Sequence, residues 1–320
     1  MQDLYEEPFS AGKYKDDFLG FESGLSVDKK QLLSLSISTA PYVTMYREDI
    51  MKANGFPYEP AEFGKFIENP DNLIKIAKKL KENNKYIFSY PTDLTDVVGN
   101  SLGYFDDKLD YVRYGNLFEK SLDIMMQSSK NGWLLDENFW GEGGKTALKE
   151  DKLAMCFYGS YIMGTLERYV PEQKGKWRIT TPPLGLASWA SDSRAAINIQ
   201  SDHKEEAWKL IEYIVTQKNK GGVDYTNTIP SYKPYINFEK NLNKKLQFYG
   251  DQNVYPIIKK LAENTKYFKL TPMDHKALEI YRNSVWTVMK QKSKPDEAVD
   301  KMKKNIEKEL SKDKKALIGE

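Results

Sequence analysis

Apolar and polar residues along this chain follow two periods, and together they predict alternating strands and helices. Residues 153–169 begin with an apolar run, pass a glycine at Gly159 and continue with helical spacing, which predicts a buried strand, a turn and a helix. Residues 178–185 and residues 194–200 predict two further strands, and residues 205–216 predict a helix. This order of strands and helices indicates α/β layers.

The region upstream also predicts strands and helices in alternation. Residues 32–46 alternate apolar with small polar residues and break at Pro41, which predicts two short strands around a bend that can act as a hinge. Residues 72–83 have the spacing of an amphipathic helix, and residues 85–90 have the composition of a strand. The helix is therefore expected to pack on a sheet.

The two ends of the chain differ from this middle part. Residues 1–30 are polar with one apolar cluster and predict a connector or a fragment rather than regular elements. Residues 238–310 contain only helix signals, with Pro295 at a first-turn position. The final segment, residues 311–320, is expected to be frayed.

Length and composition narrow the class of protein. The 320 residues suffice for one large domain or two mid-sized ones. With 40% hydrophobic and 29% charged residues the chain is typical of a globular protein, and no run approaches the roughly 18 apolar residues of a membrane span. The 48 basic and 46 acidic side chains nearly cancel, so no nucleic-acid partner is expected. The first residues do not have the pattern of a signal peptide.

Residues that commonly serve catalysis or metal binding do not form motifs here. Cys156, the one cysteine, excludes an internal disulfide and lies in an apolar run where a thiol is usually inert. His203 and His275 fit no metal spacing. The sequence GEGGKT at 141–146 lacks the first glycine of a phosphate loop, because Phe139 stands at that position. We therefore expect no catalytic residue, no metal and no cofactor.

Carboxylates leave one enzymatic alternative open. A glycoside hydrolase needs two carboxyl groups that flank one bond. The residues that could in principle supply them are Asp93, Asp96, Asp106, Asp107 and Asp192. The sequence gives no pair among them with a fixed geometric relation.

Aromatic residues are frequent and many lie outside the periodic elements. The chain has 21 Tyr, 14 Phe and 6 Trp, and many of the tyrosines fall in predicted loops. A sugar ring has an apolar C–H face that can cover an aromatic ring, and hydroxyl edges that need polar partners. Aromatic residues interleaved with short polar ones therefore indicate a binding cleft suited to a carbohydrate.

Several stretches of the chain resemble a known family. These are AMCFYGSY at 154–161, RITTPPLG at 178–185 and RAAINIQSDHKEEAWKLIEYIVTQ at 194–217. In this order they resemble the bacterial extracellular solute-binding proteins of sugar ABC transporters, the group that includes maltose-binding protein. Upstream, STAPYVTMYREDIMKANGFPYEPAEFGKF at 38–66 resembles the segment in which the chain of that family crosses between its lobes.

The resemblance implies an α/β, two-lobe fold of the type II periplasmic-binding-protein class, which closes about a hinge on its ligand. In the family, several strands and helices of the first lobe precede the crossing strand, whereas here that strand already begins near Ile37. The first lobe is therefore expected to be incomplete. The implied segments are 1–36 as a remnant of the N-terminal lobe, 37–187 as the first part of the C-terminal lobe, 188–240 as a segment of the N-terminal lobe, and 241–320 as the closing helices of the C-terminal lobe.

The resemblance also implies where the ligand contacts lie. Tyr161 follows Gly159 and falls where the family commonly has a stacking aromatic residue. The other expected contacts lie on the crossing strand, at a strand end, on the segment that returns to the other lobe and beyond it. They are Thr39, Tyr42, Tyr90, Thr92, Asp93, Trp189, Ser191, Asp192, Arg194 and Asn227, with Tyr225, Asp274 and His275 as further candidates. Trp177, Trp208 and Trp286 lie inside periodic elements and are assigned to packing.

The partners implied by the resemblance are a sugar or oligosaccharide and the permease subunits of an ABC transporter. The implied location is the extracellular face of the cytoplasmic membrane or the periplasm, often with a lipid anchor on a cysteine that would precede residue 1. Three alternatives stay open: a carbohydrate-active hydrolase, a solute-binding protein for a peptide, polyamine or metal chelate, and a non-binding remnant that contacts only a protein. An anionic ligand would make Arg194 indispensable.

Overall fold

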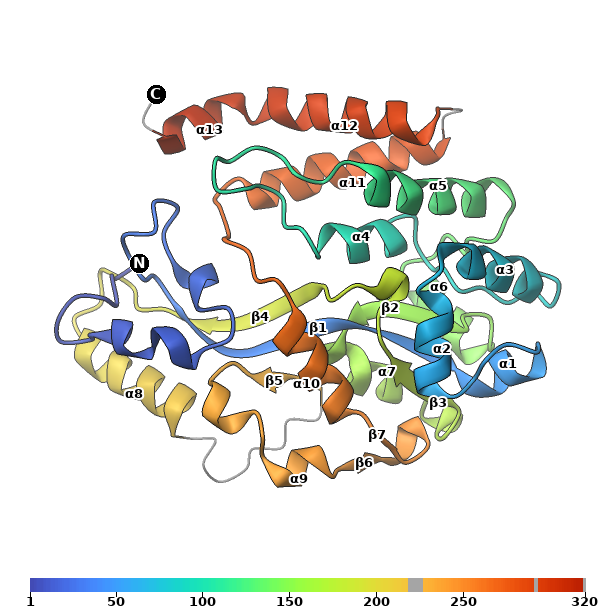
Figure 1. Cartoon of the computed structure of the whole chain (residues 1–320), viewed down its shortest axis with the longest axis horizontal. Helices are drawn as coiled ribbons and strands as arrows, with labels where there is room; N and C mark the ends of the chain where they lie inside the picture. Colours follow the sequence, from blue (N-terminus) through green and yellow to red (C-terminus); the bar gives the residue numbers. More distant parts are fainter. Residues whose placement is uncertain (218–226, 291–292, 319–320) are drawn as a thin grey trace.

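The computed structural model describes residues 1–217, 227–290 and 293–318, and it shows a mixed α/β molecule (Figure 1). The strands are β1 (Leu35–Arg47), β2 (Met155–Gly159), β3 (Trp177–Thr180), β4 (Trp189–Ala195), β5 (Ile229–Pro230), β6 (Lys245–Leu246) and β7 (Gln252–Asn253). The helices are α1 (Glu48–Ala53), α2 (Pro60–Ile67), α3 (Pro70–Lys81), α4 (Asp93–Gly99), α5 (Asn116–Lys130), α6 (Glu142–Lys149), α7 (Met163–Tyr169), α8 (Lys204–Thr216), α9 (Glu239–Leu242), α10 (Tyr255–Asn264), α11 (Asp274–Lys290), α12 (Pro295–Glu309) and α13 (Ser311–Ile318). Among the described residues, no helix has the length and apolar character needed to cross a membrane.

Strand β1 is the centre of the sheet and has different partners along its length. Its second half pairs antiparallel with β2 and β3, and its first half pairs antiparallel with β4 and β5. The prediction of two short strands around Pro41 is wrong, because one strand runs through this residue. The register with β4 shifts between Ala40 and Pro41. A proline has no N–H to donate, and the local irregularity accommodates it without ending the strand.

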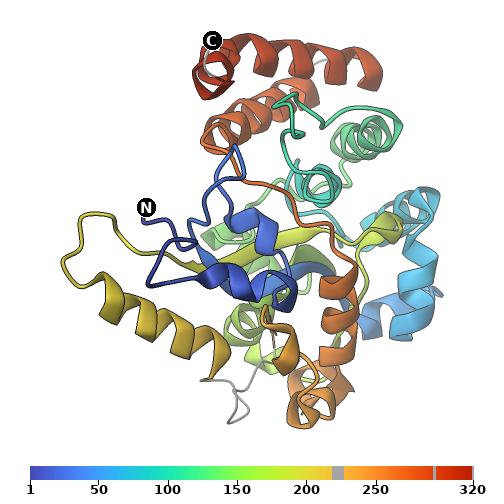
Figure 2. The ribbon, with the colours of Figure 1, turned by 60° about the vertical axis from the view of Figure 1, so that its left-hand side comes forward.

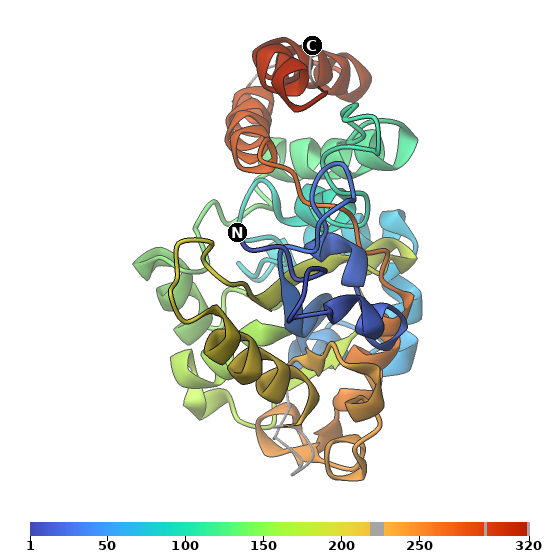
Figure 3. The ribbon, with the colours of Figure 1, turned by 90° about the vertical axis from the view of Figure 1, so that its left-hand side faces the viewer.

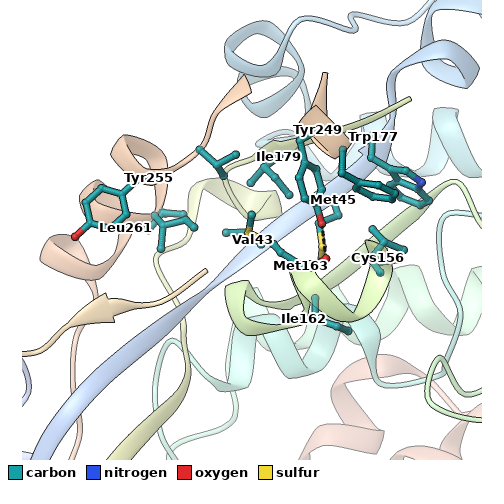
Figure 4. Close-up of a cluster of buried hydrophobic side chains, with 14 of the residues drawn as sticks. Val43, Met45, Cys156, Ile162, Met163, Trp177, Ile179, Tyr249, Tyr255 and Leu261 are labelled. Atoms are coloured by element: carbon teal, nitrogen blue, oxygen red, sulfur yellow. Dashed lines mark hydrogen bonds between the residues drawn. The ribbon is translucent and has the colours of Figure 1, made fainter. Parts of the chain in front are cut away.

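Side chains of the sheet alternate between two hydrophobic clusters, as the period of a strand requires. On one face, Val43 and Met45 of β1 join Cys156 of β2 and Trp177 and Ile179 of β3 (Figure 4). The expected burial of Trp177 is confirmed, since its side chain is fully buried.

The opposite face of the sheet is covered by helices. Tyr46 of β1 and Phe157 of β2 lie in a second cluster with residues of α1 to α5, and the ring of Tyr46 stacks on Phe63 at 4.2 Å. A third cluster joins α4 and α5 to α11 and α12 and includes Phe118 and Tyr281. In Figures 1 and 3 these helices are stacked in the upper part of the molecule, with α12 uppermost.

The N-terminal segment and α8 form a smaller unit around the first half of β1. A fourth cluster unites Leu4 and Phe18 with Leu35 and with Trp208 of α8. The rings of Phe9 and Trp208 meet edge to face at 6.1 Å. Figures 1 and 2 show this unit at the left of the molecule, with α8 along its edge.

Several local predictions need correction. The strand expected at 194–200 is instead β4, which begins at Trp189 and ends at Ala195, and residues 238–310 contain the short strands β6 and β7 besides their helices. Residues 1–30 are not without regular structure, because Ala11–Asp17 and Phe21–Gly24 form 3-10 helices. Residues 85–90 do not form a strand: Tyr86 bridges Leu153 and Phe88 bridges Leu134, and two separate partners do not make a continuous ladder. The tail predicted to fray forms α13 as far as Ile318, tied to the rest by surface ion pairs such as Lys314 to Asp110 at 2.6 Å. The division into lobe segments at 36, 187 and 240 stays a prediction.

Candidate functional site

Tyr161 lies just beyond the end of β2, on a short 3-10 helix formed by Ser160–Ile162. Its ring lies over Gly159, where an added β-carbon would stand 2.7 Å from Cδ1 of Tyr161 and 2.7 Å from Cβ of Ala190. The Tyr161 side chain is 38% exposed. The flat apolar ring of Tyr161 therefore packs closely against the backbone of Gly159, and part of the ring is exposed to solvent.

Asn227, one of the expected ligand contacts, lies next to this turn. The Ser160 hydroxyl donates to the carbonyl of Asn227, and Nδ2 of Asn227 donates to the carbonyl of Tyr161 at 3.4 Å. The side chain of Asn227 thus supports the backbone that carries the ring. Tyr225 lies outside the described residues.

Tyr42 pairs with Gly159 across β1 and β2 and so lies beside Tyr161. Its hydroxyl accepts a hydrogen bond from Nδ2 of Asn100 at 3.2 Å. Burial raises the pKa of Tyr42 well above its usual value, and the nearby Asp96 and Tyr161 add to the rise. The phenol therefore keeps its proton and can donate it to an acceptor.

Asp93 is the first residue of α4, and its carboxylate is buried. One carboxylate oxygen, Oδ2, accepts hydrogen bonds from the N–H groups of Ser89 at 2.7 Å and Tyr90 at 3.1 Å, and from the Ser89 hydroxyl at 3.0 Å. Burial raises the pKa of the Asp93 carboxyl to about 7, and these hydrogen bonds oppose the rise. Asp93 therefore shapes the loop that carries Tyr90.

Thr92 and Asp96 place further polar groups beside Asp93, at the start of α4 and within it. The buried Thr92 hydroxyl donates to Oδ2 of Asp96 at 2.8 Å. Burial raises the pKa of Asp96, while the hydrogen bond from Thr92 and the charge of Arg113 lower it. Arg113 is itself buried, with its guanidinium carbon 3.5 Å from the ring centroid of Tyr104. The half-buried Asp96, close to Tyr42, thus has a counter-charge near it.

Tyr90 packs against Trp286 of α11. The indole Nε1 of Trp286 donates to the Tyr90 hydroxyl at 3.0 Å, and the two rings meet edge to face at 5.5 Å. Trp286 was expected to serve packing, and the residue it packs against is Tyr90. We refer to the residues gathered here as the aromatic surface: Tyr42, Tyr90, Asp93, Asp96, Asn100, Tyr161 and Trp286.

Thr39, Trp189 and Ser191 lie where β1 and β4 pack against the segment before α11. We refer to this contact region as the Trp189 joint. The buried Trp189 ring contacts Tyr267 at 5.6 Å and Phe268 at 4.8 Å. Its Nε1 donates to the carbonyl of Ser191 at 3.1 Å. Thr39 is buried as well, whereas the Ser191 side chain is exposed. The Trp189 ring is thus packed within this joint rather than displayed on a surface.

Asp192 and Arg194 form an ion pair at 2.6 Å, with side chains 4% and 13% exposed. Arg194 also donates from Nε to the Ser34 hydroxyl at 2.8 Å and from Nη1 to the Ser23 hydroxyl at 2.7 Å. Asp192 accepts a further bond from the Ser36 hydroxyl. Both charges therefore hold the N-terminal segment to β1 and β4.

Asp274 and His275 make contacts at the start of α11. Asp274 accepts a hydrogen bond from the Thr271 hydroxyl at 2.6 Å. His275 is largely exposed, and its Nε2 lies 3.5 Å from Glu279 on the same helix. Both side chains are thus used in local contacts of the helix.

Two aromatic residues that contact each other, Tyr158 and Trp140, were not predicted from the sequence. Tyr158 of β2 is half-buried, with Ser89 and Asp93 close to its hydroxyl. The ring of Trp140 lies 6.1 Å from that of Tyr158, and Trp140 is 45% exposed. Strand alternation could have placed Tyr158 on the face opposite Phe157, but no pattern in the sequence brings residue 140 near residue 158.

The described residues give little support for metal or thiol chemistry. No group of three His, Cys, Asp or Glu residues within them could hold a metal ion. Burial raises the pKa of the Cys156 thiol well above its usual value. Since the thiolate is the nucleophile, a cysteine in this state is unreactive.

Two grooves have linings that do not include Tyr161. A groove of about 760 Å³ lies between α11 and α12 and is lined by residues that include Ile280, Thr287 and Met302. A smaller one, of about 310 Å³, is lined by Met163, Asn227 and Tyr249 among others. The Tyr161 ring lines neither of them and is presented on an open surface.

Sequence comparison gives one match. A family described as bacterial extracellular solute-binding protein matches residues 12–221, about two thirds of the chain. Among curated proteins, no sequence matches significantly.

Solved structures share the fold over nearly the whole chain. The ABC transporter-associated binding protein from B. animalis subsp. lactis, in complex with β-1,6-galactobiose, is 17% identical with a TM-score of 0.76, over 98% of this chain and 81% of that one. The galacto-N-biose/lacto-N-biose I-binding protein from Bifidobacterium longum, with lacto-N-biose, is 18% identical with a TM-score of 0.73, over 98% and 78%. The sugar-binding protein MalE from Xanthomonas citri is 16% identical with a TM-score of 0.72, over 99% and 82%.

At these identities the likeness concerns the fold, and it confirms the predicted α/β fold of the type II periplasmic-binding-protein class. The chain spans about four fifths of the length of each of these structures. An incomplete first lobe stays a prediction.

Proposed function

This chain belongs to the bacterial extracellular solute-binding proteins, and we propose that it captures a sugar or an oligosaccharide for an ABC transporter. Two structures with the same fold were solved with β-1,6-galactobiose and with lacto-N-biose, and a third is a sugar-binding protein. These ligands belong to those proteins, and they suggest the class of compound to test on this one.

The exposed Tyr161 ring over Gly159 is the observation that carries the proposal. A ring that is 38% exposed and fixed from below offers an apolar plane for the C–H face of a sugar. Tyr42 and Asn100 beside it supply a hydroxyl and an amide, and Asp96 supplies a carboxylate. Such groups meet the hydroxyl edge of a sugar, because each hydroxyl both donates and accepts.

We propose that the ligand lies between the unit around α8 and the larger remainder of the chain, which close on it as a clamp. The packed joint of Trp189, Tyr267 and Phe268 supports a hinge near Pro41, where β1 changes partners. In this arrangement Trp189 and Thr39 act by positioning the two parts, and Asp192 and Arg194 act by holding the smaller unit together.

The proposed partners are the permease subunits of an ABC transporter, with the chain on the extracellular face of the cytoplasmic membrane or in the periplasm. The family to which the chain belongs is extracellular, which supports this location. A lipid anchor on a cysteine upstream of residue 1 is part of the same proposal.

We also propose that the chain has no catalytic role. A glycoside hydrolase would need two available carboxyl groups. Asp93 is buried and accepts three hydrogen bonds on one oxygen, and Asp192 is in an ion pair with Arg194. Chromogenic glycosides should therefore not be turned over by the protein.

Isothermal titration tests the sugar proposal. The panel consists of β-1,6-galactobiose, lacto-N-biose and maltose, with spermidine as the probe for another ligand class. We expect a saccharide to bind with a dissociation constant near the micromolar range, about 8 kcal/mol. Tyr161→Ala should weaken it at least about tenfold, or about 1.4 kcal/mol. Tyr213→Ala is the matched control, since Tyr213 on α8 is 51% exposed and lies outside the aromatic surface.

The outcomes separate the alternatives. Heat with spermidine and none with the saccharides would assign the protein to another ligand. Equal losses for Tyr161→Ala and Tyr213→Ala would remove Tyr161 from the site. Stimulation of a reconstituted transporter ATPase without any sugar would favour the non-binding alternative, in which the chain contacts only a protein.

A further inference from the structure

Helices α11 and α12 lie side by side in the upper part of the molecule, and a groove of about 760 Å³ runs between them (Figures 1 and 3). We refer to it as the α11–α12 groove. Its floor is apolar and consists of the buried side chains of Val288, Ala298 and Met302, with the half-buried Ile280 beside them. Covering such a floor is favourable, because it removes apolar surface from water. The floor is therefore suited to the apolar face of a partner.

The wall that α11 contributes to the groove is polar but uncharged. It consists of Asn283, Ser284 and Thr287, which lie on one face of the helix. The Ser284 hydroxyl donates to the carbonyl of Ile280 at 2.8 Å, and the Thr287 hydroxyl donates to that of Asn283 at 2.9 Å. Each hydroxyl oxygen keeps acceptor capacity, and the exposed Asn283 adds an amide. This wall can therefore form hydrogen bonds with a partner but does not attract a charge.

The wall that α12 contributes is cationic. Lys301, Lys304 and Lys308 line the groove and are exposed. Residues three, four and seven positions apart share one face of a helix, so the three ammonium groups form a row. None of the three forms an ion pair with another described residue. Lys303, which is not part of the lining, instead pairs with Glu307 at 3.9 Å. The groove thus has its free positive charge along one wall only.

The two acidic residues of the lining lie at the ends of the α12 wall. Glu297 is in the first turn of α12 and lies 4.0 Å from Lys294, and Glu309 is the last residue of this helix. The stretch between them covers about 18 Å at the rise of an α-helix, which is roughly three turns. The row of lysines occupies the middle of this stretch. The groove therefore has the length, the apolar floor and the charge pattern to hold a short helix.

We propose that the α11–α12 groove docks an amphipathic helix of a partner protein, whose apolar face lies on the floor and whose acidic flank faces Lys301, Lys304 and Lys308. An amphipathic helix in an apolar groove is a common mode of recognition. Charge complementarity selects an acidic flank on the α12 side and a polar, uncharged flank on the α11 side. The concave shape disfavours a membrane as the occupant, because a flat lipid surface does not reach the floor. The inference does not depend on sugar binding.

Fluorescence anisotropy of the full chain with two labelled helical peptides of about 16 residues tests the proposal. Both peptides have leucines along one face, and one carries glutamates along one flank where the other carries lysines. The acidic peptide should bind and the basic one should not, with an affinity that falls as NaCl rises from about 0.05 M to about 0.5 M. Lys304→Glu reverses a charge in the middle of the row and should weaken binding at least about fivefold. Thr287→Trp, which fills the groove from the α11 wall, should weaken it as well.

Lys303→Glu is the matched control, because it makes the same change of charge on the same helix outside the groove. It should leave the affinity for the acidic peptide within about twofold. Absence of peptide binding, equal binding of both peptides, or equal losses for Lys304→Glu and Lys303→Glu would overturn the proposal. Binding to phosphatidylglycerol vesicles, or self-association, that Lys304→Glu abolishes while the acidic peptide does not bind would assign the groove to a membrane or to a second copy instead.

Discussion

Gly159 lies directly under the ring of Tyr161, with Ala190 on its other side, so that no β-carbon fits between them. We therefore predict that Gly159→Ala shifts the ring, weakens saccharide binding and destabilises the fold. Overpacking of this kind costs about 1–3 kcal/mol. Urea denaturation and titration calorimetry on the same preparation measure the two effects.

Gly164→Ala is the control for Gly159→Ala. An added β-carbon there has its nearest neighbour at 3.7 Å, from Nη1 of Arg168, and the residue lies in α7. Since alanine is the better helix former by up to about 1 kcal/mol, this variant should be as stable as the unchanged protein or more so. If Gly159→Ala behaves in the same way, the Tyr161 ring is not supported as described.

Arg194 is predicted to matter for stability rather than for ligand affinity. Removing one partner of a buried ion pair costs about 3–5 kcal/mol, and Arg194→Ala would leave Asp192 without its counter-charge. Lys13→Ala, which breaks a more exposed pair with Glu212, should cost less than about 1 kcal/mol. Denaturation measures both, and titration at a temperature where the variant is folded measures affinity. A large loss of affinity with unchanged stability would instead make Arg194 a contact for an anionic ligand.

Trp189 and Trp140 provide a direct comparison of a buried and an exposed tryptophan. Trp189 is 4% exposed and packs on Tyr267 and Phe268, so Trp189→Ala should destabilise the protein by about 3–5 kcal/mol. Trp140→Ala should cost less, because much of its ring is already in water. Thermal unfolding of the two variants tests this order. The reverse order would mean that the Trp189 joint is not a packed element of the fold.

The faces on which the side chains of the sheet lie could be predicted from the sequence, because they depend on local periodicity. Alternation in β1 and β2 places Val43 and Cys156 on one face and Tyr46 and Phe157 on the other. The continuation of β1 through Pro41 was not accessible, since it depends on the bulged pairing with β4 that accommodates this residue. The composition of residues 85–90 wrongly predicted a strand, because this segment forms only isolated β-bridges with its neighbours.

The candidate site was predicted in part, and the omissions have a common cause. Tyr161 follows a glycine at a strand end, and the resemblance to the family implied its role as a stacking residue, which stays a prediction. Asn100 contacts Tyr42, and Trp140 contacts Tyr158, through tertiary contacts between distant segments that no local pattern encodes. The pair of Asp192 and Arg194 could have been foreseen, because residues two apart on a strand share a face and opposite charges there tend to pair.

The buried carboxyl group of Asp93 leads to a testable prediction about how the free energy of unfolding depends on pH. Burial raises the pKa of its carboxyl from 3.8 to about 7 in the folded protein. Between these values the folded state holds more protons than the unfolded state, so this group lowers the free energy of unfolding as pH rises from about 4 to about 7. The amide side chain of the variant Asp93→Asn is neutral throughout this range. The stability of the unchanged protein minus that of Asp93→Asn should therefore fall over this range, by about 1–3 kcal/mol, and be level above it.

Urea denaturation of both proteins at pH 4.5, 6 and 8 measures this difference. Asp96 also has a raised pKa, but it is present in both proteins, so most of its contribution cancels. The N–H groups of Ser89 and Tyr90 and the Ser89 hydroxyl favour the charged carboxylate, and their effect opposes that of burial. A difference that grows in favour of the unchanged protein as pH rises would mean that these three hydrogen bonds outweigh burial. In that case Asp93 is charged at neutral pH and holds the Tyr90 loop as an anion.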